Sequence, residues 1–210
     1  EFGIGGTFDT TNNLSAATAA PGDWGGIFFH ATSSGSIDHA ILRYGGGKTP
    51  IEGEFNEFNL IEIHQADVRI ANSRLEFNDK GTGVSGVDAS RNGRGTNGDA
   101  VVFVRGAQPI IVNNEFRENA GSHIISIDVN SLNSFERIDR GRSTGLAERV
   151  VAGDDNVGPL IQGNLMRNNG INGMEVRGAA LTTQVVWDDT DIVHVLYDEV
   201  YVPNHHTYSG

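Results

Sequence analysis

The chain has 210 residues, of which 27 are acidic and 15 are basic, so its formal net charge at pH 7 is −12. This acidic balance argues against a nucleic-acid surface and against adsorption to anionic lipid, because both need a clustered basic face. The absence of cysteine excludes disulfides, zinc sites built on thiolates and cysteine nucleophiles. No apolar run approaches the ~20 residues of a membrane-spanning helix, so we expect no membrane insertion.

Along the chain, short runs of alternating apolar and polar residues end at Gly or Asn, which is the pattern of short β-strands. Apolar residues at helical spacing are interrupted within a turn or two. One set of expected strands covers residues 26–30, 60–64, 100–105 and 150–152. Each precedes a longer phrase, at 37–45, 68–78, 110–119 and 160–169. A third strand is expected at 83–87, 123–128 and 173–177, and a fifth round at 184–187 and 191–197.

The longer phrases share one plan, in which apolar residues lead to Asn and then to an alternating run that ends at Asn or Gly. The positions expected to be equivalent are Ala40, Asn72, Asn114 and Asn164. Their uneven spacing fits a stack of repeats from which residues 88–98 and 130–148 leave as surface loops. Asn tolerates left-handed bends and its amide can satisfy backbone groups, so we expect these Asn side chains to serve the scaffold.

Three strands in each of about five rounds predict an all-β chain, a parallel β-solenoid with two loop excursions. Residues 24–29 and 35–46, together with the run 161–171, resemble coils of the right-handed parallel β-helix repeat proteins. That family includes pectate-lyase-like enzymes and many large secreted or surface proteins of bacteria, and the phrase around Trp24 is most similar to the latter. The resemblance covers about residues 22–202.

We expect residues 1–210 to form a single domain that is a fragment of a longer protein. Residues 1–21 are expected to be a flank or partial cap, residues 22–202 the coils, and residues 203–210 a tail. Because the ends of a solenoid expose unpaired strand edges, end-to-end self-association is expected as well.

Two enzyme hypotheses depend on outward-facing strand positions. Cleavage or epimerisation of a uronic-acid polymer needs a base beside the carboxylate and cations that neutralise it. The candidate residues for that chemistry are His64, Arg69, Arg105, His123 and Arg177. Glycoside hydrolysis needs two flanking carboxylates instead, and its candidates are Glu62, Asp67, Asp99 and Asp128. The alternative for all of them is that outward positions of such a fold must be polar in any case.

Metal binding is suggested by Asp188, Asp189 and Asp191, which form a carboxylate cluster between two apolar runs. Hard oxygen ligands suit Ca²⁺, although adjacent Asp residues are also ordinary turn formers. A second acidic pair lies at 154–155. No other cofactor is required by the pattern.

These observations favour a non-catalytic β-helix module of a large secreted or cell-surface bacterial protein, with an extracellular or cell-surface location implied by the resemblance. It would act as a rigid spacer with an adhesive or carbohydrate-binding face, for a polysaccharide or a cell-surface glycan. Aromatic residues suited to stacking on sugars, or simply to packing, are Trp24, Phe28, Trp187 and Tyr197. The alternative is a polysaccharide-active enzyme, namely a uronan lyase, an epimerase or a glycoside hydrolase acting on an outward strand face.

Overall fold

The computed structural model describes residues 18–51, 54–81, 95–121, 123–133 and 158–203. These residues form β-strands, turns and one short 3₁₀ segment, η2 (Val129–Ser131), and contain no α-helix. The expectation of an all-β chain with parallel sheets is therefore confirmed for the described part. No helix there is long and apolar enough to cross a membrane. The strands expected at 83–87 and 150–152, the acidic pair at 154–155, and most of the flank, the tail and both loops lie outside the described residues.

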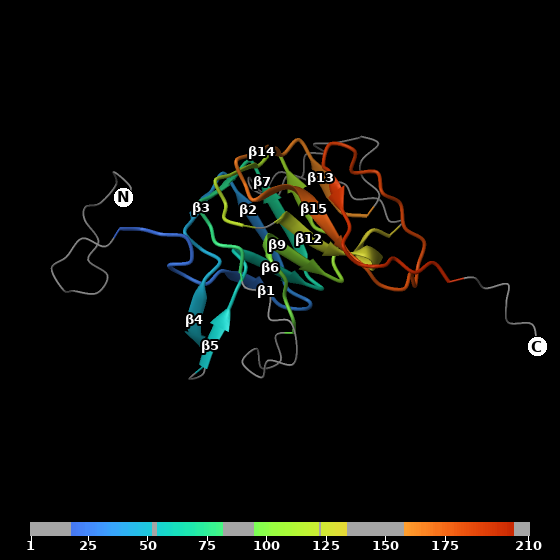
Figure 1. Cartoon of the computed structure of the whole chain (residues 1–210), viewed down its shortest axis with the longest axis horizontal. Helices are drawn as coiled ribbons and strands as arrows, with labels where there is room; N and C mark the ends of the chain where they lie inside the picture. The colour runs from blue at the N-terminus through green and yellow to red at the C-terminus, as the bar shows by residue number, and fades with distance from the viewer. Residues whose placement is uncertain (1–17, 52–53, 82–94, 122, 134–157, 204–210) are drawn as a thin grey trace, which may run out of the picture.

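Three parallel sheets make up the body of the structure (Figure 1). Sheet A contains, in spatial order, β1 (Ile27–Phe29), β6 (Ile61–His64), β9 (Ala100–Arg105), β12 (His123–Asp128), β15 (Ile171–Arg177) and β16 (His194–Val195). Sheet B contains β2 (Ser34–Asp38), β7 (Asp67–Ala71), β10 (Ile110–Val112) and β13 (Leu160–Gln162). Sheet C contains β3 (Ile41–Arg43), β8 (Arg74–Glu76), β11 (Glu115–Arg117) and β14 (Leu165–Arg167).

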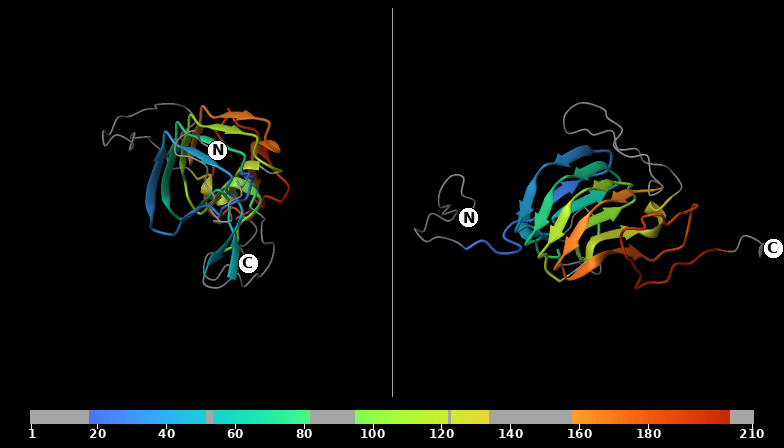
Figure 2. Two further views of the ribbon diagram at one scale, coloured as in Figure 1. Left: turned by 90° about the vertical axis from the view of Figure 1, so that its left-hand side faces the viewer. Right: turned by 90° about the horizontal axis from the view of Figure 1, so that it is seen from above.

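The chain visits the three sheets in a fixed order, A then B then C, and each pass adds one strand beside the strand of the previous pass. Figure 2 shows the result, with strands side by side in chain order from blue to orange. Four such passes occur in the described residues, and β15 and β16 then extend sheet A alone. An antiparallel hairpin of β4 (Lys48–Ile51) and β5 (Glu54–Glu57), which the sequence did not predict, projects away from the sheets (Figure 1).

The assignment of third strands from the sequence was wrong in one respect. Strand β12 pairs with β9 on one side and with β15 on the other, in the same sheet as β1 and β6, so β12 and β15 do not form a separate class. The reason is that each longer phrase already holds two strands with a bend between them. In the second pass the bend is at Asn72, whose φ of 50° lies in the left-handed region. Three strands per pass remain, but two of them belong to the phrase.

Left-handed residues stack at the bends from pass to pass. Between sheets B and C they are His39, Asn72, Asn113 and Gly163, and between sheets C and A they are Tyr44, Phe77, Glu118 and Asn168. The register shows that Asn72 is equivalent to Asn113, so the sequence alignment of Asn72 with Asn114 was one residue out. Non-glycine residues pay a steric cost in this region, which Asn bears better than most.

The residue after most of these left-handed bend positions is Asn, and these Asn side chains form ladders of amide hydrogen bonds along the stack. Asn78 Nδ2 donates to Asn119 Oδ1 at 2.9 Å, and Asn119 Nδ2 donates to Asn169 Oδ1 at 2.8 Å. In the other ladder, Asn114 Nδ2 donates to Asn164 Oδ1 at 3.0 Å. The same amides also bind backbone groups of neighbouring strands, as in the bond from Asn119 Nδ2 to the Leu75 carbonyl. The expected scaffold role is confirmed for Asn114 and Asn164.

The core lies between the sheets and follows the predicted alternation. Ile61, Ile63, Met174 and Val176, expected to point inward, are all fully buried. They belong to one continuous apolar cluster with residues from sheets B and C, such as Phe116. The alternate residues of each strand therefore point away from the core and form the outer faces of the sheets.

The expected fifth round is largely absent. Only the two-residue β16 forms between 191 and 197, and Val185 makes an isolated bridge to Asn133. Two carboxylates occupy the edge of β13 that another strand of sheet B would need. The Ile161 N–H donates to Asp189 Oδ1 at 3.2 Å, and the Gly163 N–H donates to Asp191 Oδ2 at 2.7 Å. Sheet B therefore ends at its fourth strand in the described residues.

Candidate functional site

The outer face of sheet A holds most of the polar residues that the sequence singled out. One row across the strands runs Phe28, Glu62, Phe103, Ser126 and Glu175. In the adjacent row His64 is the register partner of Arg105, and Asp128 is the register partner of Arg177. Three of the five catalytic candidates, His64, Arg105 and Arg177, therefore share one sheet face.

A buried carboxylate–imidazole pair lies at the amino-terminal end of this face. His64 Nε2 is 2.9 Å from Glu62 Oε2, and the two side chains are 5% and 0% exposed. Glu62 Oε1 also accepts hydrogen bonds from the Asn59 N–H at 3.1 Å and from Asn97 Nδ2 at 3.0 Å. A buried carboxylate is stable only when such donors surround it. The pair is thus fixed by its neighbours rather than open to a substrate.

Aromatic rings cover His64 on this face. Its imidazole centroid is 4.8 Å from the ring centroid of Phe28 and 5.5 Å from that of Phe103. Phe58 packs edge-on against Phe28 at 6.2 Å. Alternation placed Glu62 and His64 outward, as the sequence predicted, but these rings and the segment carrying Asn97 exclude solvent from them.

The guanidinium group of Arg177 binds other groups of the protein. Nη1 donates to Ser126 Oγ at 2.6 Å, Nη2 donates to the Val104 carbonyl, and Cζ lies 4.2 Å from the Phe103 ring centroid. Burial lowers the pKa of Arg177, against the opposing effect of the Asp128 and Glu175 carboxylates. This arginine therefore ties three strands together, through bonds and a cation–π contact.

The carboxyl-terminal edge of the same face opens onto a groove between sheets A and B. The groove has a volume of about 420 Å³, and its lining includes Asp67, Asp128 and Gln108. Asp128 also binds two groups of the protein. Its Oδ1 accepts hydrogen bonds from the Gly106 backbone N–H at 2.7 Å and from Ser131 Oγ at 2.8 Å. Arg105 is exposed nearby on β9. Two of the four hydrolase candidates thus line one groove.

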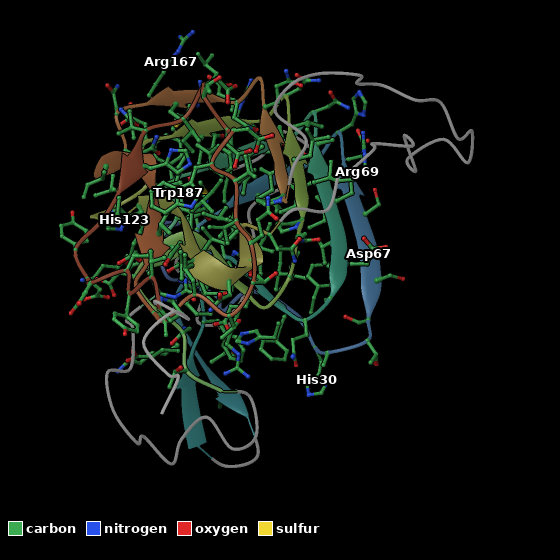
Figure 3. The ribbon with its side chains drawn as sticks, turned by 90° about the vertical axis from the view of Figure 1, so that its right-hand side faces the viewer. His30, Asp67, Arg69, His123, Arg167 and Trp187 are labelled. Atoms are coloured by element: carbon green, nitrogen blue, oxygen red, sulfur yellow. The ribbon has the colours of Figure 1, made fainter. Side chains whose placement is uncertain are left out.

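The remaining candidates lie elsewhere (Figure 3). Arg69 belongs to sheet B and forms a buried ion pair with Asp38 of the preceding pass. His123 lies at the opposite side of the molecule from Arg69 in Figure 3 and contacts Tyr197, with 5.4 Å between ring centroids. Asp99 pairs with Lys80 at 2.9 Å. These residues stabilise the stack at separate places and do not join the groove.

The three carboxylates predicted to bind Ca²⁺ are close in sequence, and two of them have backbone partners. Asp189 is fully buried and, like Asp191, accepts an N–H from the edge region of β13. Within the described residues, no group of three or more His, Cys, Asp or Glu side chains is placed to hold a metal ion. The Ca²⁺ hypothesis remains a prediction.

The aromatic residues considered for sugar stacking are dispersed. Trp24 Nε1 donates to the Arg43 carbonyl at 2.6 Å, whereas Trp187 stacks on His194 with 5.5 Å between ring centroids. Phe28 lies over His64, and Tyr197 lies against His123. They form separate packing contacts rather than one platform.

The sequence did not predict the hydrogen-bond partners that hold the candidate side chains in place. Asn97 and Ser126 were not singled out, although both bond to candidate residues. The outward arginines of sheet C, Arg43, Arg74, Arg117 and Arg167, were not grouped either. Arg43, Arg117 and Arg167 occupy one equivalent position of the repeated phrases, which was the signal that could have grouped them.

Comparison with protein-family models, with curated proteins and with solved structures gave no match to this chain.

Proposed function

We propose that the chain is a right-handed parallel β-helix module, a non-catalytic, rigid spacer with a carbohydrate-binding face in a large secreted or cell-surface bacterial protein. The repeated visit to sheets A, B and C in one order supports a helical path of the backbone. The hand follows from the strong preference of parallel crossover connections for a right-handed path. The sequence resemblance over about residues 22–202 supports the same assignment.

One observation carries the non-catalytic part of the proposal: three of the five candidate catalytic side chains are bound to the protein itself. His64 is buried against Glu62, Arg69 is paired with Asp38, and Arg177 is bonded to Ser126 and Val104. A general base or a carboxylate-neutralising cation must reach substrate atoms, and these side chains already have other partners. Chemistry of the lyase type would need all of them to change partners.

The test combines a glycan array with a lyase assay that follows the absorbance of unsaturated products at neutral to alkaline pH. We expect binding to some glycans and no turnover on any uronan. Turnover that is lost in His64→Ala and in Arg105→Ala would overturn the proposal. A far-ultraviolet circular dichroism spectrum dominated by helix would overturn the fold assignment.

A second candidate function, glycoside hydrolysis, is favoured by the presence of both Asp67 and Asp128 in the groove between sheets A and B. Paired carboxylates are the requirement of that chemistry. Release of reducing sugar from a neutral polysaccharide, abolished by Asp67→Asn and by Asp128→Asn, would establish it. Asp128→Asn also loses part of a backbone cap, so its melting temperature must be measured beside its activity.

End-to-end self-association with a second copy of the chain is part of the same proposal. The carboxyl-terminal segment exposes large apolar side chains, namely Val193, Leu196, Tyr197, Tyr201 and Val202. Several exposed apolar side chains at the open end of a stack are typical of an interaction surface. We expect sedimentation to show a concentration-dependent dimer that Val193→Asp weakens, and a monomer at all concentrations would contradict this.

A further inference from the structure

The outer face of sheet C gathers positive charge on an acidic protein. Two side-chain columns cross its four strands. One column runs Ile41, Arg74, Glu115 and Leu165, and the other runs Arg43, Glu76, Arg117 and Arg167. These are four of the seven arginines in the described residues, whereas the face carries only two carboxylates. The face therefore has a net positive charge although the whole chain has −12.

The two carboxylates organise the arginines rather than cancel them. Glu76 is fully buried and forms ion pairs with Arg43 on one side and with Arg117 on the other. Glu115 pairs with Arg74 Nε at 2.9 Å, and its other oxygen lies 3.8 Å from Arg117 Nη1. These contacts hold the guanidinium groups in fixed positions while a quarter or more of the Arg74 and Arg117 side chains stays exposed.

Arg117 is firmly protonated. The hydrogen bond to Glu76 and the nearby Glu115 and Glu118 carboxylates raise the pKa of Arg117. Arg167 lies next to it in register on β14, is exposed, and extends away from the ribbon in Figure 3. Neighbouring parallel strands are ~4.8 Å apart, so the charges recur at short intervals along the stack.

A groove of about 460 Å³ runs beside these columns at the bend between sheets B and C. His39, Asn72 and Asn113, which are the stacked left-handed residues, line one side. Arg74 and Glu115 line the other side, and the exposed apolar side chains of Ile41 and Leu165 lie at its two ends. The groove crosses all four passes, so a linear polymer can follow the stack for about 14 Å.

The arginines of the sheet C face, of which Arg74 lines this groove and the others lie beside it, favour a polymer with carboxylates along its length. Guanidinium groups bind carboxylates through two parallel hydrogen bonds. Amide side chains suit sugar hydroxyls because they both donate and accept, and the apolar ends can contact the C–H faces of sugar rings. We propose that the groove and the arginines of sheet C bind a linear polysaccharide of uronic acids. This names the ligand class of the carbohydrate-binding face and therefore rests on the proposed function.

The test measures binding of an oligouronate hexamer from alginate by isothermal titration calorimetry in low salt. Arg167→Gln should weaken the Kd about threefold and the double variant Arg74→Gln, Arg167→Gln about tenfold, in line with partly exposed charged contacts. Lys48→Gln is the control, since it removes one exposed positive charge from the β4–β5 hairpin instead of sheet C. It should leave the Kd unchanged. Raising the salt concentration to 0.5 M should weaken binding strongly, because screening then acts within a few ångströms.

Three results would overturn the inference: no binding of the hexamer, an equal loss of affinity in Lys48→Gln, or equally tight binding of a DNA duplex. Retained melting temperatures of the variants establish that they are folded. Failure here is distinct from failure of the proposed function. A chain that binds only neutral glycans on the array and turns over none remains a non-catalytic carbohydrate-binding module.

Discussion

The middle passes of the stack and the segment 179–202 are built from similar residues but differ in what surrounds them. In the middle, β9 lies between β6 and β12, and side chains such as Phe116 and Ile125 are fully buried. In the segment 179–202 the pairing is limited to β16 and two isolated bridges. Tyr197 and Val202 there are 64% and 68% exposed.

The comparison indicates that an apolar alternating run forms a well-buried strand when both of its edges are covered, by strands in the middle of the stack and by a strand and two carboxylates at β13. The middle runs gain hydrogen bonds, amide ladders and core contacts from both neighbours. The run 191–197, which contains β16, has a neighbouring strand, β15, on one side only. At β13, the carboxylates of Asp189 and Asp191 take the place of the missing strand. In a stacked architecture the stability of a repeat depends on its interfaces.

Core truncation should separate the two regions most strongly. Phe116→Ala removes a fully buried ring, and we expect it to lower the free energy of unfolding by about 3–5 kcal/mol. Tyr201→Ala, at a side chain 55% exposed, should change it by less than about 0.5 kcal/mol. Denaturant titration measures both. Equal losses would show that the segment 179–202 is packed as tightly as the middle.

Removing an amide of the ladder should also destabilise the protein more in the middle of the stack than at its end, by less than core truncation does. Asn119→Ala removes the acceptor for the Asn78 N–H and the donor to the Leu75 carbonyl, all within the buried interior. Unsatisfied buried groups of this kind cost about 1–3 kcal/mol each. Asn169→Ala, at the last rung of the ladder and partly exposed, should cost less. Thermal melts of the two variants test the order, and a reversed order would contradict the ladder as a source of stability.

The carboxylates at the edge of β13 should contribute less than an interior rung. Asp189→Ala leaves the Ile161 N–H without its acceptor, and we expect a loss of about 1–2 kcal/mol. If the cluster with Asp188 and Asp191 also binds Ca²⁺, saturating Ca²⁺ should raise the melting temperature relative to chelator. Asp189→Asn should then remove most of that gain. Identical melting curves in Ca²⁺ and in chelator would rule against the ion but not against the capping role.

The smallest expected effect is a pH dependence confined to the segment 179–202. Burial beside Trp187 lowers the pKa of His194 below its ordinary value of 6.5. The unfolded chain then binds a proton more readily than the folded chain, so stability should fall as the pH drops below about 6.5 and level off beneath the folded pKa. His194→Gln should flatten this part of the profile. An unchanged profile in that variant would assign the dependence to another group.

Much of the fold could be predicted from the sequence because its signals are local. Alternation placed Ile61 and Ile63 inward, and glycine and asparagine marked the bends, since both are properties of a few neighbouring residues. The strand 123–128 was predicted with its observed bounds. Its sheet was not, because membership of a sheet depends on partners that are distant in sequence.

The sequence by itself therefore determined most strands of the four passes, which of their side chains face the core and where the chain bends between them. Only the tertiary structure decided what each outward side chain does. Stacking buried Glu62 and His64 beneath phenylalanine rings, turned Asp189 into a backbone cap, and aligned Arg117 with Arg167 on one face. The physical reason is that strands one pass apart are neighbours in space while dozens of residues separate them along the chain.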